Sequence, residues 1–139
     1  MPLDITHTIQ TKSDQLNADD LLGGDLLITV EGVRIVNDPQ QPVQIFYYGC
    51  GNKPYKPCLT VRKILAALWG VDAEKWTNRQ MNLFLDPTVR WAGKEVGGIR
   101  VNAMSNIPNV ATVKVQVRRG AKQEFTIQPI QLEGNANNG

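Results

Sequence analysis

The sequence predicts a mainly β protein, a small barrel with one helix between its third and fourth strands and a β-hairpin appended at the C-terminal end. Three observations support this fold class. Apolar and polar residues alternate over several short stretches that are separated by turn residues, as in strands. The parity of the first stretch changes at Gly32, as a bulge or sharp bend would change it. One segment, residues 60–70, has helical spacing instead.

The length and composition indicate one ordinary globular domain. The chain has 139 residues, of which 42% are hydrophobic and 20% are charged. No apolar run approaches the roughly 18 residues that span a bilayer. The N-terminal stretch lacks the basic-then-apolar order of a signal peptide, so we expect a cytoplasmic protein without a membrane partner. We divide the chain into a flexible arm (residues 1–20), a single domain (21–132) and a disordered tail (133–139).

The first strand is long and bent. Leu26, Ile28 and Val30 share one parity, whereas Val33 and Ile35 have the other parity beyond the glycine. Such a strand can take part in both halves of the wall of a small closed barrel. A turn over residues 37–39 separates it from the second strand.

The second strand, residues 43–48, presents aromatic side chains outward. If Val43, Ile45 and Tyr47 face the core, Phe46 and Tyr48 face away from it. Folding does not require outward aromatics, so they either stack on bases or are covered by another element or subunit.

The loop over residues 49–57 is rich in glycine, proline and lysine. It carries Tyr55 between Lys53 and Lys56. A mobile basic loop of this kind can close over a strand of nucleic acid, so we expect Tyr55 to stack on bases as well.

One amphipathic helix follows this loop. Its apolar positions form a single buried face at i, i+3, i+4 and i+7, with Thr60 as a predicted N-cap and Gly70 as the residue that ends it. Asp72 is predicted to cap a short second helix that reaches Arg79. We assign Trp69 and Trp76 to the core because each lies beside a buried helix face.

The remaining chain is predicted to be strands. Residues 81–85 alternate, a turn at Asp86-Pro87 leads to a ribbon over 89–91, and a turn over 92–94 reverses it into 95–101. A loop over 102–111 precedes a last hairpin, which pairs residues 113–117 with 125–127 across a turn that holds three basic residues, Arg118, Arg119 and Lys122. The residues predicted to point outward from it are Lys114, Gln116 and Arg118.

The charge is strongly asymmetric although the net charge is only +2. Residues 1–49 hold two Lys or Arg against seven acidic residues, whereas residues 50–119 hold twelve against four. The resulting field over the middle of the chain attracts phosphates, or it belongs to a solvated basic face.

The order of the elements is strand, strand, short strand, helix, strand, strand. This is the order of a five-stranded OB barrel, whose nucleic-acid face lies on strands two and three with flanking loops. Phe46, Tyr48 and Tyr55 fall on that part of the predicted fold.

A series of motifs runs from the end of the helix to the strand that ends at Val101. They are Leu68-Trp69-Gly70, Asp72, Trp76, Arg79-Gln80-Met81-Asn82-Leu83-Phe84, Asp86-Pro87, Gly93-Lys94 and Ile99-Arg100-Val101. Over roughly residues 25–130 the chain resembles a family of small tailed-phage proteins of OB-like character. In size and layout it is also similar to phage single-stranded-DNA-binding proteins. Many of those end in an acidic tail that recruits replication partners, and the sequence GNANNG departs from that pattern.

The resemblance implies a phage protein in the host cytoplasm that binds single-stranded DNA in replication or recombination. We do not expect an enzyme, because His7 is the only histidine and lies far in sequence from Cys50 and Cys58. We expect no metal or other cofactor. The alternative is a phage structural or adaptor protein whose outward aromatics form a subunit interface, with a second copy of the chain as a partner.

The candidate nucleic-acid-binding residues combine basic and aromatic side chains, which suits a polyanion whose units also have flat faces. They are Phe46, Tyr48, Lys53, Tyr55, Lys56, Arg62, Arg79, Arg90, Trp91, Lys94 and Arg100. Trp91 is ambiguous, since Val89 on the same strand face argues for the core and Arg90 argues for a ligand edge. We expect the basic members to include one continuous groove.

Overall fold

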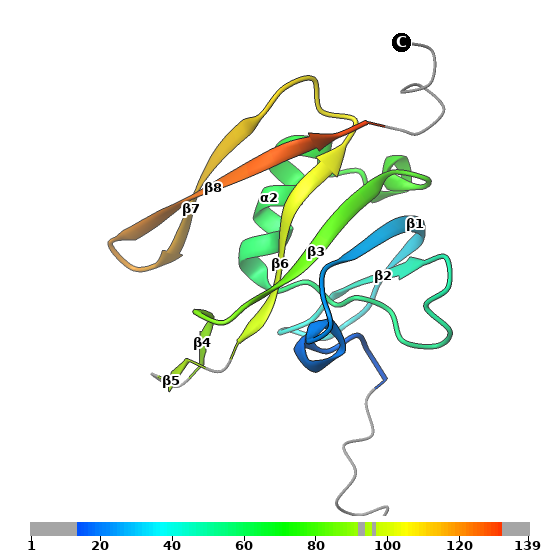
Figure 1. Cartoon of the computed structure of the whole chain (residues 1–139), viewed down its shortest axis with the longest axis horizontal. Helices are drawn as coiled ribbons and strands as arrows, with labels where there is room; N and C mark the ends of the chain where they lie inside the picture. The colour runs from blue at the N-terminus through cyan, green and yellow to red at the C-terminus, as the bar shows by residue number, and fades with distance from the viewer. Residues whose placement is uncertain (1–13, 92–93, 96, 132–139) are drawn as a thin grey trace, which may run out of the picture.

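A computed structural model describes residues 14–91, 94–95 and 97–131, with the backbone alone for residues 90, 91, 94 and 95. The predicted mainly β class is confirmed (Figure 1). A six-stranded mixed sheet has the order β2-β1-β3-β6-β8-β7, and a separate two-stranded ribbon pairs β4 with β5. The strands are β1 Leu26–Ile35, β2 Val43–Tyr47, β3 Gln80–Asp86, β4 Arg90–Trp91, β5 Lys94–Glu95, β6 Gly98–Ser105, β7 Ala111–Arg118 and β8 Ala121–Ile130.

The sheet is open over the described residues, so the predicted closure into a barrel does not form among these strands. The bent first strand is nevertheless confirmed. Residues Leu26–Thr29 pair with β3, the residues from Val30 to Ile35 pair with β2, and the register shifts between Val30 and Gly32. The bulge at Gly32 thus lies where β1 changes from pairing with β3 to pairing with β2.

The short strand expected before the helix has no counterpart beyond a single bridge, which lies in the segment predicted as a loop. Ile45 N–H donates to Tyr55 O at 2.8 Å, and Tyr55 N–H donates to Ile45 O at 2.9 Å. Pro54 and Pro57 flank this bridge. Because proline has no N–H to donate, the ladder cannot extend far on either side of Tyr55.

The helix α2, Leu59–Trp69, lies between β2 and β3 in the sequence. Its apolar face packs into the core. Cys58, rather than the predicted Thr60, is its N-cap residue, and Gly70 ends it at φ 91° as expected. A short 3₁₀ turn, η2 Ala73–Trp76, follows and is shorter than predicted, but Asp72 caps it through Glu74 N–H.

The core assignments of the two tryptophans are confirmed. Trp69 is 6% exposed and Trp76 is 5% exposed, and their ring centroids lie 5.9 Å apart. The indole N–H of Trp69 donates to Ser105 O at 2.7 Å, and that of Trp76 donates to Gly70 O at 3.2 Å. Each indole therefore buries its ring and satisfies its donor.

β6 continues to Ser105, so the loop predicted to begin at residue 102 is shorter than expected. The extra length has a partner, because Ala103–Ser105 pair in parallel with Gln128–Ile130 of β8. This short ladder attaches the predicted C-terminal hairpin, which is confirmed, to the rest of the sheet.

The N-terminal boundary lies earlier than predicted. Leu16 and Leu21 are buried, and residues Ala18–Leu21 form a 3₁₀ turn, η1. Residues 1–13 of the expected arm and residues 133–139 of the expected tail lie outside the described part of the chain. Among the described residues, no helix is long and apolar enough to cross a membrane.

Candidate nucleic-acid interface

The outward aromatics of β2 lie as predicted. Ile45 and Tyr47 are buried, whereas Phe46 is half-buried and Tyr48 is 56% exposed. The guanidinium of Arg34 lies over the ring of Phe46, 5.6 Å from its centroid. The hydroxyl of Tyr48 donates to Asn78 Oδ1 at 3.3 Å, which leaves the ring beside solvent. Of the two outward aromatics, Tyr48, which directly follows β2, is therefore the more accessible to a flat ligand.

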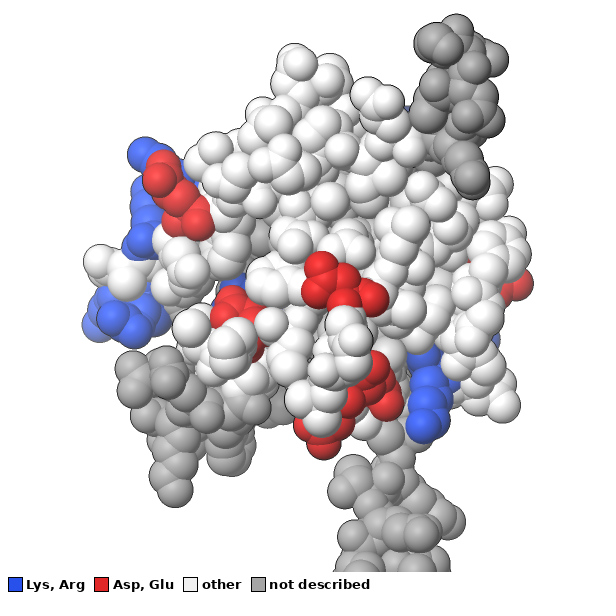
Figure 2. Space-filling model, in the orientation of Figure 1, with Lys and Arg blue, Asp and Glu red and all other residues white. Residues whose placement is uncertain are grey.

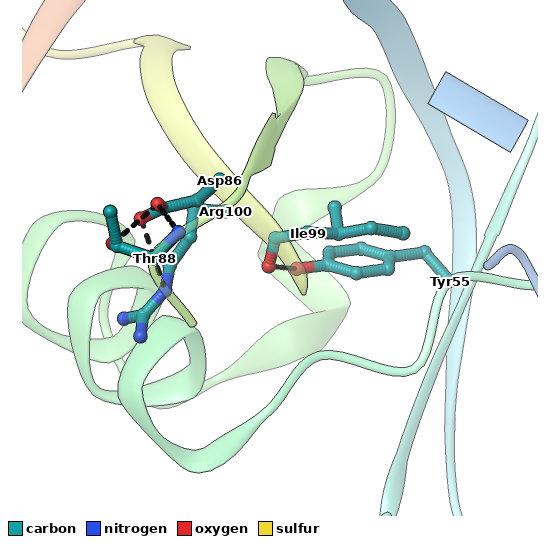
Figure 3. A network of polar contacts seen from close by, with 5 residues as sticks. All are labelled: Tyr55, Asp86, Thr88, Ile99 and Arg100. Carbon is teal, nitrogen blue, oxygen red and sulfur yellow. Dashed lines mark hydrogen bonds and ion pairs between the residues drawn. The ribbon is translucent and has the colours of Figure 1, made fainter. Parts of the chain in front are cut away.

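Tyr55 is not available for stacking, and its prediction as a stacking residue is wrong. Its side chain is 2% exposed, and its hydroxyl donates to Ile99 O at 3.5 Å (Figure 3). Burial raises the pKa of this phenol well above its ordinary value. The bridge to Ile45 turns the side chain into the core, a pairing that the loop's composition did not indicate.

Three of the predicted cations are engaged by the protein itself. Lys56 pairs with Asp14 at 3.5 Å and its side chain is only 12% exposed. Arg62 donates to Pro57 O at 3.3 Å and to Gln40 O at 3.2 Å. The guanidinium of Arg79 lies 5.6 Å from the ring centroid of Trp69. Lys56 joins its loop to the N-terminal segment, Arg62 joins α2 to two loops, and Arg79 covers the last residue of α2. Lys53, in contrast, is exposed.

Arg100 is, with Lys56, one of the two predicted cations whose side chains are almost enclosed. Its side chain is 13% exposed, and its guanidinium lies 5.2 Å from the ring centroid of Phe125. Its Nε lies 3.9 Å from Asp86 Oδ2, while Asp86 Oδ1 accepts from the amide and hydroxyl of Thr88 (Figure 3). Nε and Nη1 of Arg100 are buried without a hydrogen-bond partner among the described residues.

The side chains of Arg90, Trp91 and Lys94 lie outside the described part of the structure. Their backbones form the β4–β5 ribbon, in which Arg90 pairs with Glu95 and Trp91 pairs with Lys94. The ribbon confirms the predicted reversal, and the roles of the three residues stay predictions.

A basic cluster that the candidate list omitted lies at the end of the β7–β8 hairpin. We call Arg118, Arg119 and Lys122 the hairpin tip; all three are exposed. Gly120 makes the two-residue turn possible with φ 73°. Figure 2 shows Lys and Arg gathered at this end of the face, with an acidic group against the upper ones, and most of the other Asp and Glu over its centre and lower part. In the sequence, this cluster is indicated by three basic residues within five positions.

A cleft of about 400 Å³ lies beside the hairpin tip. We call it the hairpin cleft. Its walls come from the start of α2, the turn that precedes β4, strand β6 and the hairpin. It is lined by Cys58, Leu59, Thr60, Thr88, Val89, Arg100, Gln116, Val117, Arg118 and Gln123.

The outward aromatics and the hairpin tip do not lie side by side. β2, which carries Phe46 and is followed directly by Tyr48, is one edge of the sheet, and β7, which carries Arg118, is the other. Five strand spacings of about 4.8 Å separate the two edges, or about 24 Å along a flat sheet. The aromatics and the hairpin tip are therefore distinct patches on one molecule.

No group of three or more metal-ligating side chains lies together within the described ranges. Both cysteines are free thiols, with Cys58 exposed and Cys50 half-buried. No protein-family model, curated protein or solved structure matches this chain.

Proposed function

We propose that this chain binds single-stranded DNA without strong sequence preference, in phage replication or recombination. The observation that carries the proposal is the hairpin tip. Arg118, Arg119 and Lys122 are exposed together, and no described acidic side chain forms an ion pair with any of them. Free cations gathered on one element neutralise phosphates and release condensed counterions, which is the main source of affinity in sequence-tolerant binding.

The fold supports the same proposal. β1, β2, the Tyr55 bridge, α2, β3 and β6 follow one another in the order of an OB fold whose third strand has been shortened. In that fold strands two and three and their flanking loops bind oligonucleotides. We infer that the chain is OB-like and that the β7–β8 hairpin adds a basic extension to it.

Tyr48 and Phe46 supply the stacking part of the proposal. Tyr48 presents an exposed ring. Phe46 lies under Arg34, and a guanidinium stacks on bases as an aromatic ring does. A strand of several nucleotides that runs across the sheet from β7 to β2 would meet cations at one edge and aromatic faces at the other.

A fluorescence anisotropy titration with labelled oligo-dT and with a duplex of the same length, at two salt concentrations, tests the proposal. The expected result is tighter binding of oligo-dT than of duplex, with an affinity that falls as salt rises. Absence of binding at the lower salt, or binding that salt does not change, would contradict it.

The second candidate is a structural or adaptor protein of a phage, in which Phe46 and Tyr48 form an interface between subunits. The observation that favours it is the exposure of large apolar side chains: Leu22, Leu27, Ile35, Tyr48 and Val71 are each more than half exposed, from 52% to 90%. Analytical ultracentrifugation distinguishes the two candidates. A stable oligomer that Tyr48→Ala dissociates, with no affinity for oligo-dT, would favour the adaptor.

A further inference from the structure

The hairpin cleft brings two arginines together from distant parts of the chain. Arg100 comes from β6 and Arg118 from the end of β7, and both line the same cleft of about 400 Å³. That volume lies within the range of small-molecule sites, about 300–1,000 Å³. None of the lining residues is acidic. Asp86, the partner of Arg100, is not among them, so the cleft itself is bordered by positive charge.

The guanidinium of Arg100 has hydrogen-bonding capacity that the protein leaves unused. Nε and Nη1 are buried and have no hydrogen-bond partner among the described residues, since 3.9 Å from Nε to Asp86 is an ionic contact and too long for a hydrogen bond. Buried donors of a charged group are costly when they stay unpaired. A small anion in the cleft would provide the guanidinium with a second counter-charge besides Asp86.

The neutral residues of the cleft suit an oxyanion as well. The hydroxyl of Thr60 and the side-chain amides of Gln116 and Gln123 can donate hydrogen bonds. Cys58, the N-cap of the 11-residue helix α2, makes no side-chain capping hydrogen bond. The amides of a first helical turn favour an anion, which adds to the effect of the two arginines.

We propose that the hairpin cleft binds one phosphate group, held by Arg100 and Arg118. The principal source of this phosphate is the backbone or the end of a DNA strand, and in this respect the inference rests on the proposed function. Free inorganic phosphate has the same chemistry and is the second source. Arg100 provides the enclosed contact, and Arg118 links the cleft to the rest of the hairpin tip, so that one ordered phosphate fixes where the strand enters the basic patch.

Cys58 provides a local measurement, because it is exposed and lines the cleft while Cys50 lies elsewhere and is half-buried. The rate of Cys58 alkylation by iodoacetamide, a neutral reagent, is measured by peptide mass spectrometry on the full chain. Inorganic phosphate, oligo-dT with a 5′-hydroxyl and oligo-dT with a 5′-phosphate are added separately, against sodium chloride at matched ionic strength. Phosphate should slow Cys58 alkylation saturably and leave the rate at Cys50 unchanged.

Two neighbouring arginines give a matched pair of variants. Arg118→Gln removes a charge that lines the cleft, whereas Arg119→Gln removes an equal charge one residue away that does not. Arg118→Gln should raise the phosphate concentration for half-protection about tenfold, which corresponds to one charge-assisted contact. Arg119→Gln should leave that concentration unchanged. Arg100→Lys keeps the charge but loses the planar fork, and it should weaken protection while the protein stays folded by circular dichroism.

The outcomes separate this inference from the proposed function. If oligo-dT binds by anisotropy but neither oligonucleotide nor phosphate protects Cys58, the cleft inference is wrong and DNA binding stands. If phosphate alone protects and no oligonucleotide binds, the cleft takes free phosphate and the proposed function fails. Protection by 5′-phosphorylated oligo-dT alone assigns the cleft to a strand end, whereas equal protection by both oligonucleotides assigns it to the backbone. Equal protection of the Arg118→Gln variant would overturn the assignment.

Discussion

Tyr55 offers the sharpest contrast between a binding role and a packing role. It was expected to stack on bases, yet its side chain is 2% exposed and its hydroxyl makes a single long hydrogen bond, 3.5 Å, to Ile99 O. Tyr55→Phe removes only that hydroxyl. A typical hydrogen bond contributes about 0.5–1.5 kcal/mol, so a bond at the limit of length should cost less than about 1 kcal/mol of unfolding free energy.

Tyr55→Ala removes the ring as well. Truncation of a fully buried aromatic side chain costs about 3–5 kcal/mol, because it leaves a cavity among the side chains around it. Urea unfolding followed by circular dichroism measures both free energies. The affinity for oligo-dT is measured in parallel by anisotropy under conditions in which each variant is folded.

The two measurements should separate stability from binding. Tyr55→Phe should bind oligo-dT with the affinity of the unchanged protein. Tyr55→Ala should lower the unfolding free energy and, where it is folded, leave the affinity for oligo-dT unchanged. If Tyr55→Ala leaves the unfolding free energy unchanged and weakens oligo-dT binding several-fold, the ring is exposed in solution, and the placement of Tyr55 in the core is refuted.

Three further predictions concern the same molecule. Tyr48→Ala should weaken oligo-dT binding by about 1–3 kcal/mol in a titration while the melting temperature stays nearly constant, because the ring is 56% exposed; an unchanged affinity would remove it from the interface. Trp76→Ala should do the reverse and cost about 3–5 kcal/mol in urea unfolding, since Trp76 is 5% exposed. The raised pKa of the Tyr55 phenol means that the folded state holds its proton more tightly than the unfolded state, so its contribution is complete below the ordinary tyrosine pKa and is lost as pH rises above it. Urea titrations at increasing alkaline pH should therefore show a smaller loss of stability in Tyr55→Phe than in the unchanged protein.

Alternation with a period of two was enough to predict which side of a strand faces the core. Ile28, Val30, Met81 and Leu83 are all buried, and the parity change at Gly32 is a real register shift. These signals are local, because a strand that buries one face must place alternate residues on it. Which strands meet at the edges of a sheet depends on contacts between distant residues. Among the described residues the six-stranded sheet is open, and Tyr55 makes only a single bridge to β2.

The candidate site was harder to predict, because distant residues determine whether a basic side chain is exposed or engaged within the protein. Arg62 donates to Gln40 O, and Arg100 lies over Phe125, contacts that span 22 and 25 positions in the sequence. No local pattern distinguishes such an arginine from one that is free to bind a phosphate. The exposure of the hairpin tip could be predicted from the sequence, because its three basic residues are close in sequence and lie beside a turn, where side chains point into solvent.

The salt dependence of oligo-dT affinity in two charge-matched variants tests the central claim most directly. Arg119→Gln removes one cation from the hairpin tip, whereas Lys75→Gln removes an exposed cation from η2, which follows the opposite end of α2 from the hairpin cleft. If the hairpin tip contacts the strand, the slope of log affinity against log salt should become shallower by about 0.7 in Arg119→Gln, the value for one phosphate on a single strand, and should not change in Lys75→Gln. Equal slopes in both variants and the unchanged protein would contradict the claim that this chain binds single-stranded DNA through its hairpin.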